Sequence, residues 1–225
     1  MSVSGTALAA SFSFSTPAGA TDTVGEPVSA SASFVTGTDS LTITLTNLEA
    51  NQKSAGQLLS DLFFTLNNVT SGGTLSSSNA NTIFVASDGS TSPGPQNTST
   101  GWVFSVSGGV FHLDGLNGAD NVPAYLIIGP PDGSGNYSNA NASIAGNGPH
   151  NPFVDQTAAF VLSISGINSD TIVTGATFSF GTTPGDNVPG GGVPDSGSTV
   201  MLLGTALGSV EILRRLALKK HSTKV

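Results

Sequence analysis

The residues best able to support hydrolytic chemistry are a histidine and an aspartate that lie two positions apart. His112 and Asp114 occur in a chain rich in serine, and these residue types together suggest a Ser-His-Asp triad. Such a triad is defined by the geometry of its three side chains, and residue types alone do not establish it. With so many serines the coincidence is expected. The sequence therefore predicts no catalytic residues and no enzyme activity.

Metal-binding and redox chemistry find little support in the sequence. The chain has no cysteine, which excludes disulfides, thiolate metal ligands and cysteine nucleophiles. Residues 132–136 (DGSGN) have a faint likeness to a calcium loop, but they lack the alternating acidic positions and the terminal glutamate that such loops need. A turn is the better interpretation. Neither a metal site nor a cofactor is predicted.

Aromatic side chains offer a different chemistry, which is stacking on sugar rings. Trp102 and Phe104 are two positions apart in an alternating segment, so they share a face, and that face is expected to be the core. Tyr137 lies in the irregular segment 129–152, is expected to be exposed, and is the candidate ligand contact. Long loops in compact domains are often functional. A polysaccharide-binding module, or a hydrolase, that uses the 129–152 loop is therefore an alternative function.

Short alternating segments would have to position these side chains. Two pairs of such segments, 28–36 with 41–46 and 102–106 with 110–113, are typical of β-hairpins. Residues 51–62 break the alternation and are expected to hold a short helix or turn. About eight to ten short strands with Gly and Asn turns predict an all-β fold, an antiparallel β-sandwich. Further strands are expected over 63–69, 82–86, 124–128, 157–165 and 172–180.

Charge is sharply divided along the chain. The formal net charge is −8, and the five cationic side chains of the last twelve residues contribute +5, so residues 1–213 carry −13. Nucleic-acid binding requires Lys and Arg to neutralise phosphates, and Lys53 is the one such residue before Arg214. Nucleic acid is therefore excluded as a partner.

The C-terminal end joins a hydrophobic segment to a basic tail. The positive-inside rule places such a tail in the cytoplasm and the preceding residues across the membrane. Residues 196–213 would span roughly 27 Å as a helix, against a hydrocarbon core of about 30 Å. We expect a transmembrane helix over 199–213; the alternative is an amphipathic or buried C-terminal helix of a soluble domain. The basic anchor consists of Arg214, Arg215, Lys219 and Lys220, with Lys224 beyond them.

A short motif stands directly before the hydrophobic segment, and it consists of Val193, Pro194, Asp195, Ser196 and Gly197. The motif, the apolar segment and the double arginine resemble the sorting signal of PEP-CTERM proteins, in its VPDSG variant. This resemblance implies a substrate of an exosortase, a membrane cysteine transpeptidase of Gram-negative bacteria. The enzyme would recognise the motif, cleave near it, and release the protein to the cell surface or the exopolysaccharide matrix. Glu211 departs from the pattern, because a carboxylate weakens membrane insertion.

These features divide the chain into four parts. Residues 1–10 lack a basic n-region and a long apolar run, and are either the remnant of a truncated signal peptide or part of the first strand. Residues 11–181 are the predicted ectodomain, 182–192 a Gly/Pro-rich linker, and 193–225 the sorting signal. The predicted function is an exported, non-catalytic surface or matrix protein. Its expected partners are an exosortase, transiently the inner membrane, and exopolysaccharide.

Overall fold

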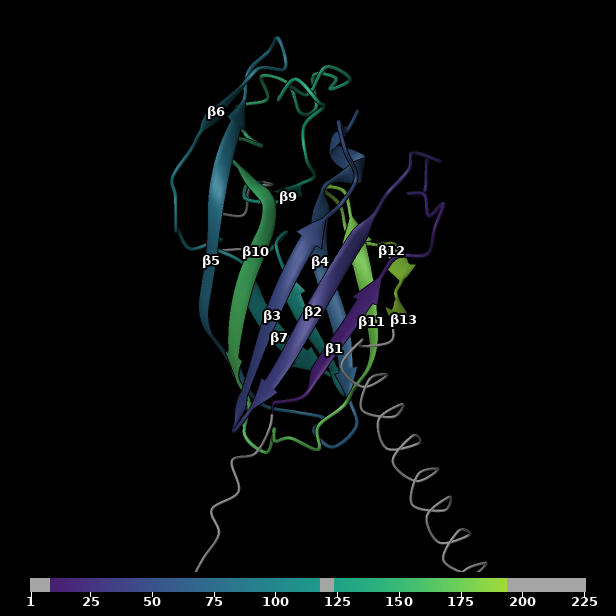
Figure 1. Ribbon diagram of the computed structural model, residues 1–225, viewed down its shortest axis with the longest axis vertical. Coiled ribbons are helices and arrows are strands. Elements are labelled where there is room, and N and C mark those ends of the chain that lie inside the picture. The colour runs from purple at the N-terminus through teal and green to yellow at the C-terminus, as the bar shows by residue number, and fades with distance from the viewer. Residues whose placement is uncertain (1–8, 118–123, 194–225) are drawn as a thin grey trace, which may run out of the picture. The chain divides into compact units, whose positions relative to one another are not determined.

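The computed structural model describes residues 9–117 and 124–193, and these residues form an all-β fold (Figure 1). The all-β class is thus confirmed. The sorting helix predicted over 199–213 lies outside the described residues, as does most of the predicted signal-peptide remnant. Within the described part of the chain, no helix is long and apolar enough to cross a bilayer.

The described strands are mostly short. They are β1 (Ser11–Ser15), β2 (Ala30–Gly37), β3 (Ser40–Asn47), β4 (Leu59–Leu66), β5 (Thr74–Val85), β6 (Thr91–Pro93), β7 (Val103–Ser107), β8 (Val110–Asp114), β9 (Ile127–Ile128), β10 (Phe153–Ser163), β11 (Val173–Phe180), β12 (Asp186–Pro189) and β13 (Gly191–Val193). A single 3-10 turn, η1 (Ala55–Gln57), precedes β4.

The strands form one hydrogen-bonded sheet that folds over, so that two groups of strands face each other (Figure 1). One group follows the order β6-β5-β10-β3-β2-β1-β13, and the other follows β12-β11-β4-β8-β7. Strand β9 joins the groups, because it pairs with β4 and lies parallel to β10. This parallel pair makes the sheet mixed, whereas the sequence predicts a wholly antiparallel one.

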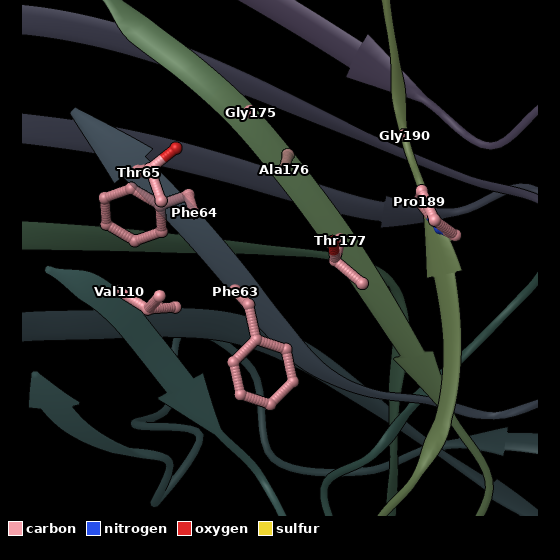
Figure 2. Close-up of a pocket in the computed structure, with 9 residues that line it drawn as sticks. All are labelled: Phe63, Phe64, Thr65, Val110, Gly175, Ala176, Thr177, Pro189 and Gly190. Atoms are coloured by element: carbon pink, nitrogen blue, oxygen red, sulfur yellow. The ribbon is translucent and has the colours of Figure 1, made fainter. Parts of the chain in front are cut away.

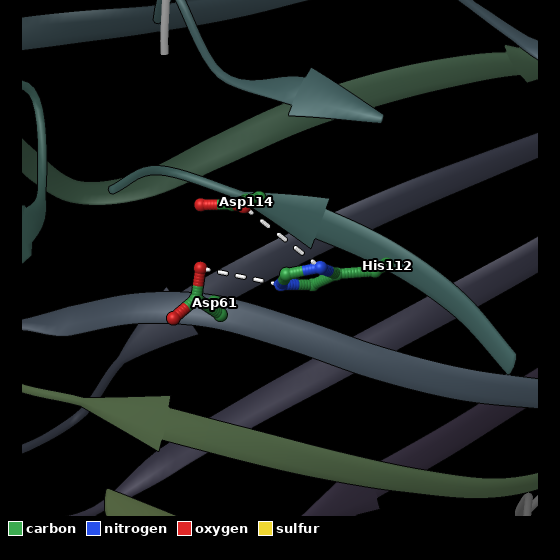
Figure 3. A group of neighbouring side chains, drawn as sticks. All are labelled: Asp61, His112 and Asp114. Atoms are coloured by element: carbon green, nitrogen blue, oxygen red, sulfur yellow. Dashed lines mark hydrogen bonds and ion pairs between the residues drawn. The ribbon is translucent and has the colours of Figure 1, made fainter. Parts of the chain in front are cut away.

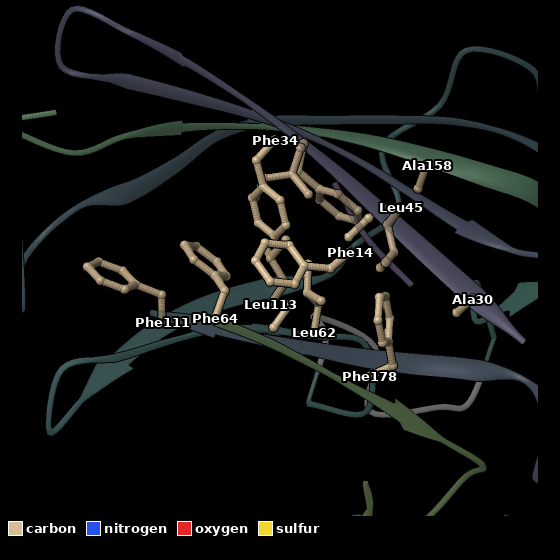
Figure 4. Packing of buried hydrophobic residues seen from close by; sticks show 14 of the residues in the cluster. Phe14, Ala30, Phe34, Leu45, Leu62, Phe64, Phe111, Leu113, Ala158 and Phe178 are labelled. Atoms are coloured by element: carbon tan, nitrogen blue, oxygen red, sulfur yellow. The ribbon is translucent and has the colours of Figure 1, made fainter. Parts of the chain in front are cut away.

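The core lies between the two groups and follows from strand alternation (Figure 4). In β2, Ala30, Ala32 and Phe34 are buried and alternate with half-buried serines. The Phe34 ring of this strand lies 5.4 Å, centroid to centroid, from Phe64 of β4 in the opposite group. Phe64 in turn stacks on Phe111 of β8 at 5.2 Å. Each fully buried phenylalanine ring stabilises the fold by roughly 1.5–3 kcal/mol. Burial of several such rings therefore stabilises this core without disulfides.

Both predicted hairpins are confirmed. Strands β2 and β3 pair in register from Ala30–Asn47 to Gly37–Ser40, and β7 pairs with β8 across a tight turn. Asp39, in the first turn, has a φ of 51°, a left-handed conformation that Asp tolerates better than most residues.

Of the short helix or turn expected within 51–62, the structure has the turn η1. Ser54 caps it, accepting a hydrogen bond from the Gly56 amide while Gln57 completes the capping box. The apolar residues of this segment have a helical spacing but serve two different clusters. Ala55 and Leu58 pack into a small second cluster, whereas Leu59, already in β4, belongs to the main core. The tertiary contacts of these apolar side chains therefore decide the local structure, and their helical spacing in the sequence does not produce a longer helix.

The linker predicted over 182–192 is wrong in its second half, because that half is part of the sheet. Strand β12 pairs with β11 in one group, and β13 pairs with β1 in the other. The chain crosses between the groups at Gly190, whose amide donates to the Ala176 carbonyl oxygen. A Cβ at Gly190 would lie 2.8 Å from Cε2 of Phe178, so only glycine fits this crossing without a shift. The Gly/Pro-rich composition of 182–192 predicts a flexible segment, but at Gly190 the missing Cβ allows the backbone to lie close to Phe178.

Candidate functional site

Four polar residues lie in one row across the outer face of the β12-β11-β4-β8 group. Asn187 of β12 lies opposite Ser179 of β11, and Ser179 lies opposite Asp61 of β4. Asp61 in turn lies opposite Asp114 of β8. Because the neighbouring Leu62 is fully buried in the core, alternation directs Asp61 to the opposite face. Three separate parts of the sequence thereby meet at one place.

A β-bulge in β4 sets the position of Asp61. Phe180 pairs with Leu59 while Ser179 pairs with Asp61, so Ser60 is an extra residue on β4. The Ser60 Oγ lies 3.1 Å from both Asp61 Oδ2 and the carbonyl oxygen of Ser179, and its proton can be donated to either. Bulges re-aim side chains and are frequent beside functional sites.

His112 completes a cluster with the two aspartates (Figure 3). Its Nε2 lies 3.4 Å from Asp61 Oδ1, and its Nδ1 lies 3.9 Å from Asp114 Oδ2. The imidazole also stacks on Phe63, its cross-strand neighbour, with ring centroids 3.9 Å apart. Each ring nitrogen thus faces a carboxylate. A Ser-His-Asp triad requires a different arrangement, with one nitrogen directed at a serine hydroxyl.

The Asp114 carboxylate is held by the loop that follows β8. Its Oδ1 accepts hydrogen bonds from the backbone amides of Leu116 and Asn117, both at 2.9 Å. Its Oδ2 accepts a further bond from the Asn117 side-chain amide at 2.8 Å. These donors fix the carboxylate before any ligand arrives, which is the positioning that a binding site needs.

The two carboxyl groups are electrostatically unequal. Burial raises the pKa of Asp61, and the charge of Asp114 adds to this effect, while the hydrogen bond to His112 opposes it. Burial also pushes the pKa of Asp114 upward and is the largest single influence on it, but the hydrogen bonds from Asn117, together with the interactions with Asp61 and His112, outweigh burial, and the pKa ends below its usual value. Asp114 is thus the carboxylate that stays ionised more readily.

A cavity of about 310 Å³ opens over this cluster. Its wall includes Asp61, His112, Asp114, Ser179 and Asn187, with Pro184 and Gly185 from the turn before β12. The Ser179 side chain is 1% exposed, and its Oγ is the one buried side-chain polar atom of the described residues that has no hydrogen-bond partner. A buried hydroxyl without a partner is costly, so this atom points to something that the cavity would hold.

A second hollow, of about 340 Å³, lies further along the same face (Figure 2). Phe63, Val110, Thr177 and Pro189 contribute to it, together with the glycine of the β12–β13 crossing. None of its nine lining residues is titratable, so it offers shape and apolar contact without acid, base or metal chemistry.

The predicted ligand contact Tyr137 is buried, which corrects the expectation that it is exposed. It is 1% exposed, and its hydroxyl donates to the Gly129 carbonyl oxygen at 2.6 Å. Its ring packs with Ile144 and Phe153 in the small second cluster. Burial also raises the pKa of the Tyr137 hydroxyl. The ring is therefore not available for stacking on a sugar.

The other sequence-based expectations for aromatic and turn residues are confirmed. Trp102 is 4% exposed, packs against Phe160 at 5.2 Å between centroids, and donates its Nε1 hydrogen to the Tyr125 carbonyl oxygen. Residues 132–136 form a turn in which Asp132 Oδ1 accepts hydrogen bonds from the amides of Ser134 and Asn136. The Ser138 side chain and these amides lower the pKa of Asp132 to about 2.

Comparison with known families gives one finding. Residues 192–216 match the model described as the VPDSG-CTERM motif. The chain carries a VPDSG-CTERM sorting signal. No curated protein and no solved structure matches the chain. The VPDSG-CTERM signal confirms the resemblance to PEP-CTERM-type proteins, and it is consistent with an exported protein.

The VPDSG-CTERM signal starts at the last strand of the described domain. Gly192 and Val193 belong to β13, where Val193 pairs with Ser13 of β1. The other motif residues and the basic anchor lie outside the described residues; they are Pro194, Asp195, Ser196, Gly197, Arg214, Arg215, Lys219 and Lys220. The first residue of the motif thus belongs to the sheet itself, whereas the composition of 182–192 predicts a free linker before the motif.

Asp61 is the site residue that sequence reasoning missed. His112 and Asp114 stand out because they are close in sequence, whereas Asp61 lies in another strand and meets them only through strand pairing. One local signal existed: Asp61 interrupts an apolar strand (LSDLFFTL), where a buried charge is expected to have a partner.

Proposed function

We propose that this chain is an exported, non-catalytic protein of the cell surface or exopolysaccharide matrix, processed by an exosortase at its VPDSG-CTERM signal. The match at residues 192–216 carries the proposal. In this scheme the segment 199–213 holds the chain in the inner membrane until cleavage, and the basic tail stays in the cytoplasm. The all-β domain is the part that reaches the surface.

The non-catalytic part of the proposal is supported by the surroundings of His112. Both of its ring nitrogens face aspartates, and nucleophile, base and orienting group do not converge as hydrolysis requires. The alternative, a polysaccharide-binding module that uses the 129–152 loop, loses its one named contact because Tyr137 is buried.

The sorting experiment changes the motif in a host that has the exosortase. Pro194→Ala with Asp195→Ala should leave the full-length chain in the inner membrane, whereas the unaltered chain should lose its C-terminal segment and reach the surface. Mass spectrometry of both mature termini, after fractionation, provides the measurement.

A second Pro-Asp pair supplies a matched control. Pro131→Ala with Asp132→Ala alters the same residue types within the turn of the 129–152 segment, and this variant should be trimmed like the unaltered chain. If the Pro194 and Asp195 variant is trimmed and exported equally well, the motif is not the signal and the proposal fails.

A further inference from the structure

We propose that Asp61, His112 and Asp114 bind one divalent transition-metal ion on the outer face of the β-domain. Each residue offers one ligand atom, and these three atoms all lie within 4.8 Å of one another. Metal–nitrogen and metal–oxygen bonds of about 2.0–2.2 Å at tetrahedral angles place ligand atoms roughly 3.4 Å apart, so the widest pair would have to close by about 1.4 Å, which side-chain rotation can supply. The ion itself would give the domain a structural or binding role beyond sorting.

Charge balance favours a cation here. Asp61 is 3% exposed and Asp114 is 7% exposed, so both carboxyl groups are largely removed from water. In the described part of the chain Lys53 is the one Lys or Arg, and its Nζ pairs with Glu26 at 2.8 Å. Within the described residues, no Lys or Arg side chain therefore pairs with Asp61 or Asp114. A buried carboxylate needs compensation, which must come from a proton or a bound cation.

The cavity supplies the remaining partner. Three protein ligands leave a coordination position for water, as in open metal sites. Ser179 lies across from Asp61 and lines the same cavity, and its buried Oγ lacks a hydrogen-bond partner. We assign this hydroxyl as the hydrogen-bond partner of the metal-bound water. The cavity of about 310 Å³ has room for that water and for exchange with solvent.

The donor set selects the class of metal. Imidazole with carboxylates suits Zn²⁺ and its first-row neighbours, whereas Ca²⁺ takes oxygen ligands and a larger coordination number. A single ion can take only one nitrogen of His112.

The test is calorimetric titration of the purified full chain, stripped with EDTA, with ZnCl₂ as the probe. We expect saturable binding of about one Zn²⁺ per chain that CaCl₂ at the same concentration does not reproduce. His112→Ala and Asp61→Asn should each weaken Zn²⁺ binding at least tenfold. His150→Ala is the matched control and should bind like the unaltered chain, because His150 instead lies with its Nδ1 2.6 Å from the Ser143 carbonyl oxygen.

A second measurement on the unaltered chain covers the case in which a variant fails to fold. X-ray absorption of the Zn²⁺-loaded chain should show one imidazole nitrogen together with oxygen ligands. Absence of saturable binding would overturn the proposal, as would unchanged binding by His112→Ala, or a coordination shell that lacks imidazole or holds several.

Discussion

Asp61 and Asp114 lie directly opposite each other on neighbouring antiparallel strands, yet their pKa values are displaced in opposite directions. Burial raises the pKa of Asp61. Burial is the largest single influence on the pKa of Asp114 as well, but the hydrogen bonds from Asn117, together with the interactions with Asp61 and His112, more than offset it and lower that pKa. Two groups of the same chemistry are thus made unequal by their surroundings, because Asp114 accepts hydrogen bonds from the loop after β8, whereas Asp61 is more deeply buried.

The first prediction compares the same substitution at these two residues in metal-free protein. The raised pKa of Asp61 means that its contribution to stability is present below the unfolded-state pKa and is lost as pH rises through the folded value. Asp61→Asn should therefore gain stability relative to the unaltered chain as pH rises above the unfolded-state pKa of about 4.

Asp114→Asn should show the opposite trend. The lowered pKa of Asp114 gives a stabilisation that is present above the unfolded-state pKa and lost as pH falls through the folded value. This variant should therefore lose stability relative to the unaltered chain as pH rises towards the unfolded-state pKa of about 4, and the difference should stay constant above that pH. His112, which contacts both carboxylates, is present in both variants. Urea unfolding in EDTA from pH 3 to pH 7 measures both; parallel curves for the two variants would contradict the prediction.

The second prediction concerns the crossing between β12 and β13. Gly190→Ala would place a Cβ 2.8 Å from Phe178 Cε2 and 3.2 Å from the Ala176 carbonyl oxygen, so we expect destabilisation by about 1–3 kcal/mol. Gly191→Ala is the control, because its nearest contact, the Ser15 carbonyl oxygen, lies 4.0 Å away. Equal urea midpoints for the two variants would show that the crossing is not tightly packed.

The third prediction tests the role of Tyr137. Tyr137→Phe removes the hydroxyl that donates to the Gly129 carbonyl oxygen and leaves that acceptor unpaired, at a cost of about 1–2 kcal/mol. Tyr125→Phe is the matched control, because Tyr125 is only partly buried, and should cost less. Thermal unfolding measures both. A Tyr137→Phe variant as stable as the unaltered chain would contradict the structural role assigned to this residue.

The fourth prediction is that the β-domain ends at Val193. A chain that stops at Val193 keeps β12 and β13, whereas one that stops at Gly185 loses both strands and the buried Val188. The shorter chain should be less stable by roughly 2 kcal/mol or more. Urea unfolding of the two chains tests this, and equal midpoints would restore the linker interpretation of 182–192.

Local sequence was sufficient to predict the two hairpins and the sorting signal. Alternation in residues 28–46 predicts the β2–β3 hairpin, because side chains of a strand point alternately to core and solvent. The VPDSG-CTERM signal is likewise a linear order of motif, apolar segment and basic tail, so it can be read without any tertiary structure.

Only the tertiary structure decided which distant residues lie next to one another and which side chains are buried. Asp61 joins His112 and Asp114 through strand pairing across a gap of about fifty residues, and a bulge at Ser60 sets its position; neither feature has a local signature. Tyr137 looks exposed from its polar neighbours, yet it is buried because its loop folds onto a second cluster. The sorting signal depends only on the linear order of residues, whereas the cluster of Asp61, His112 and Asp114 exists only because long-range strand pairing brings separate parts of the chain together.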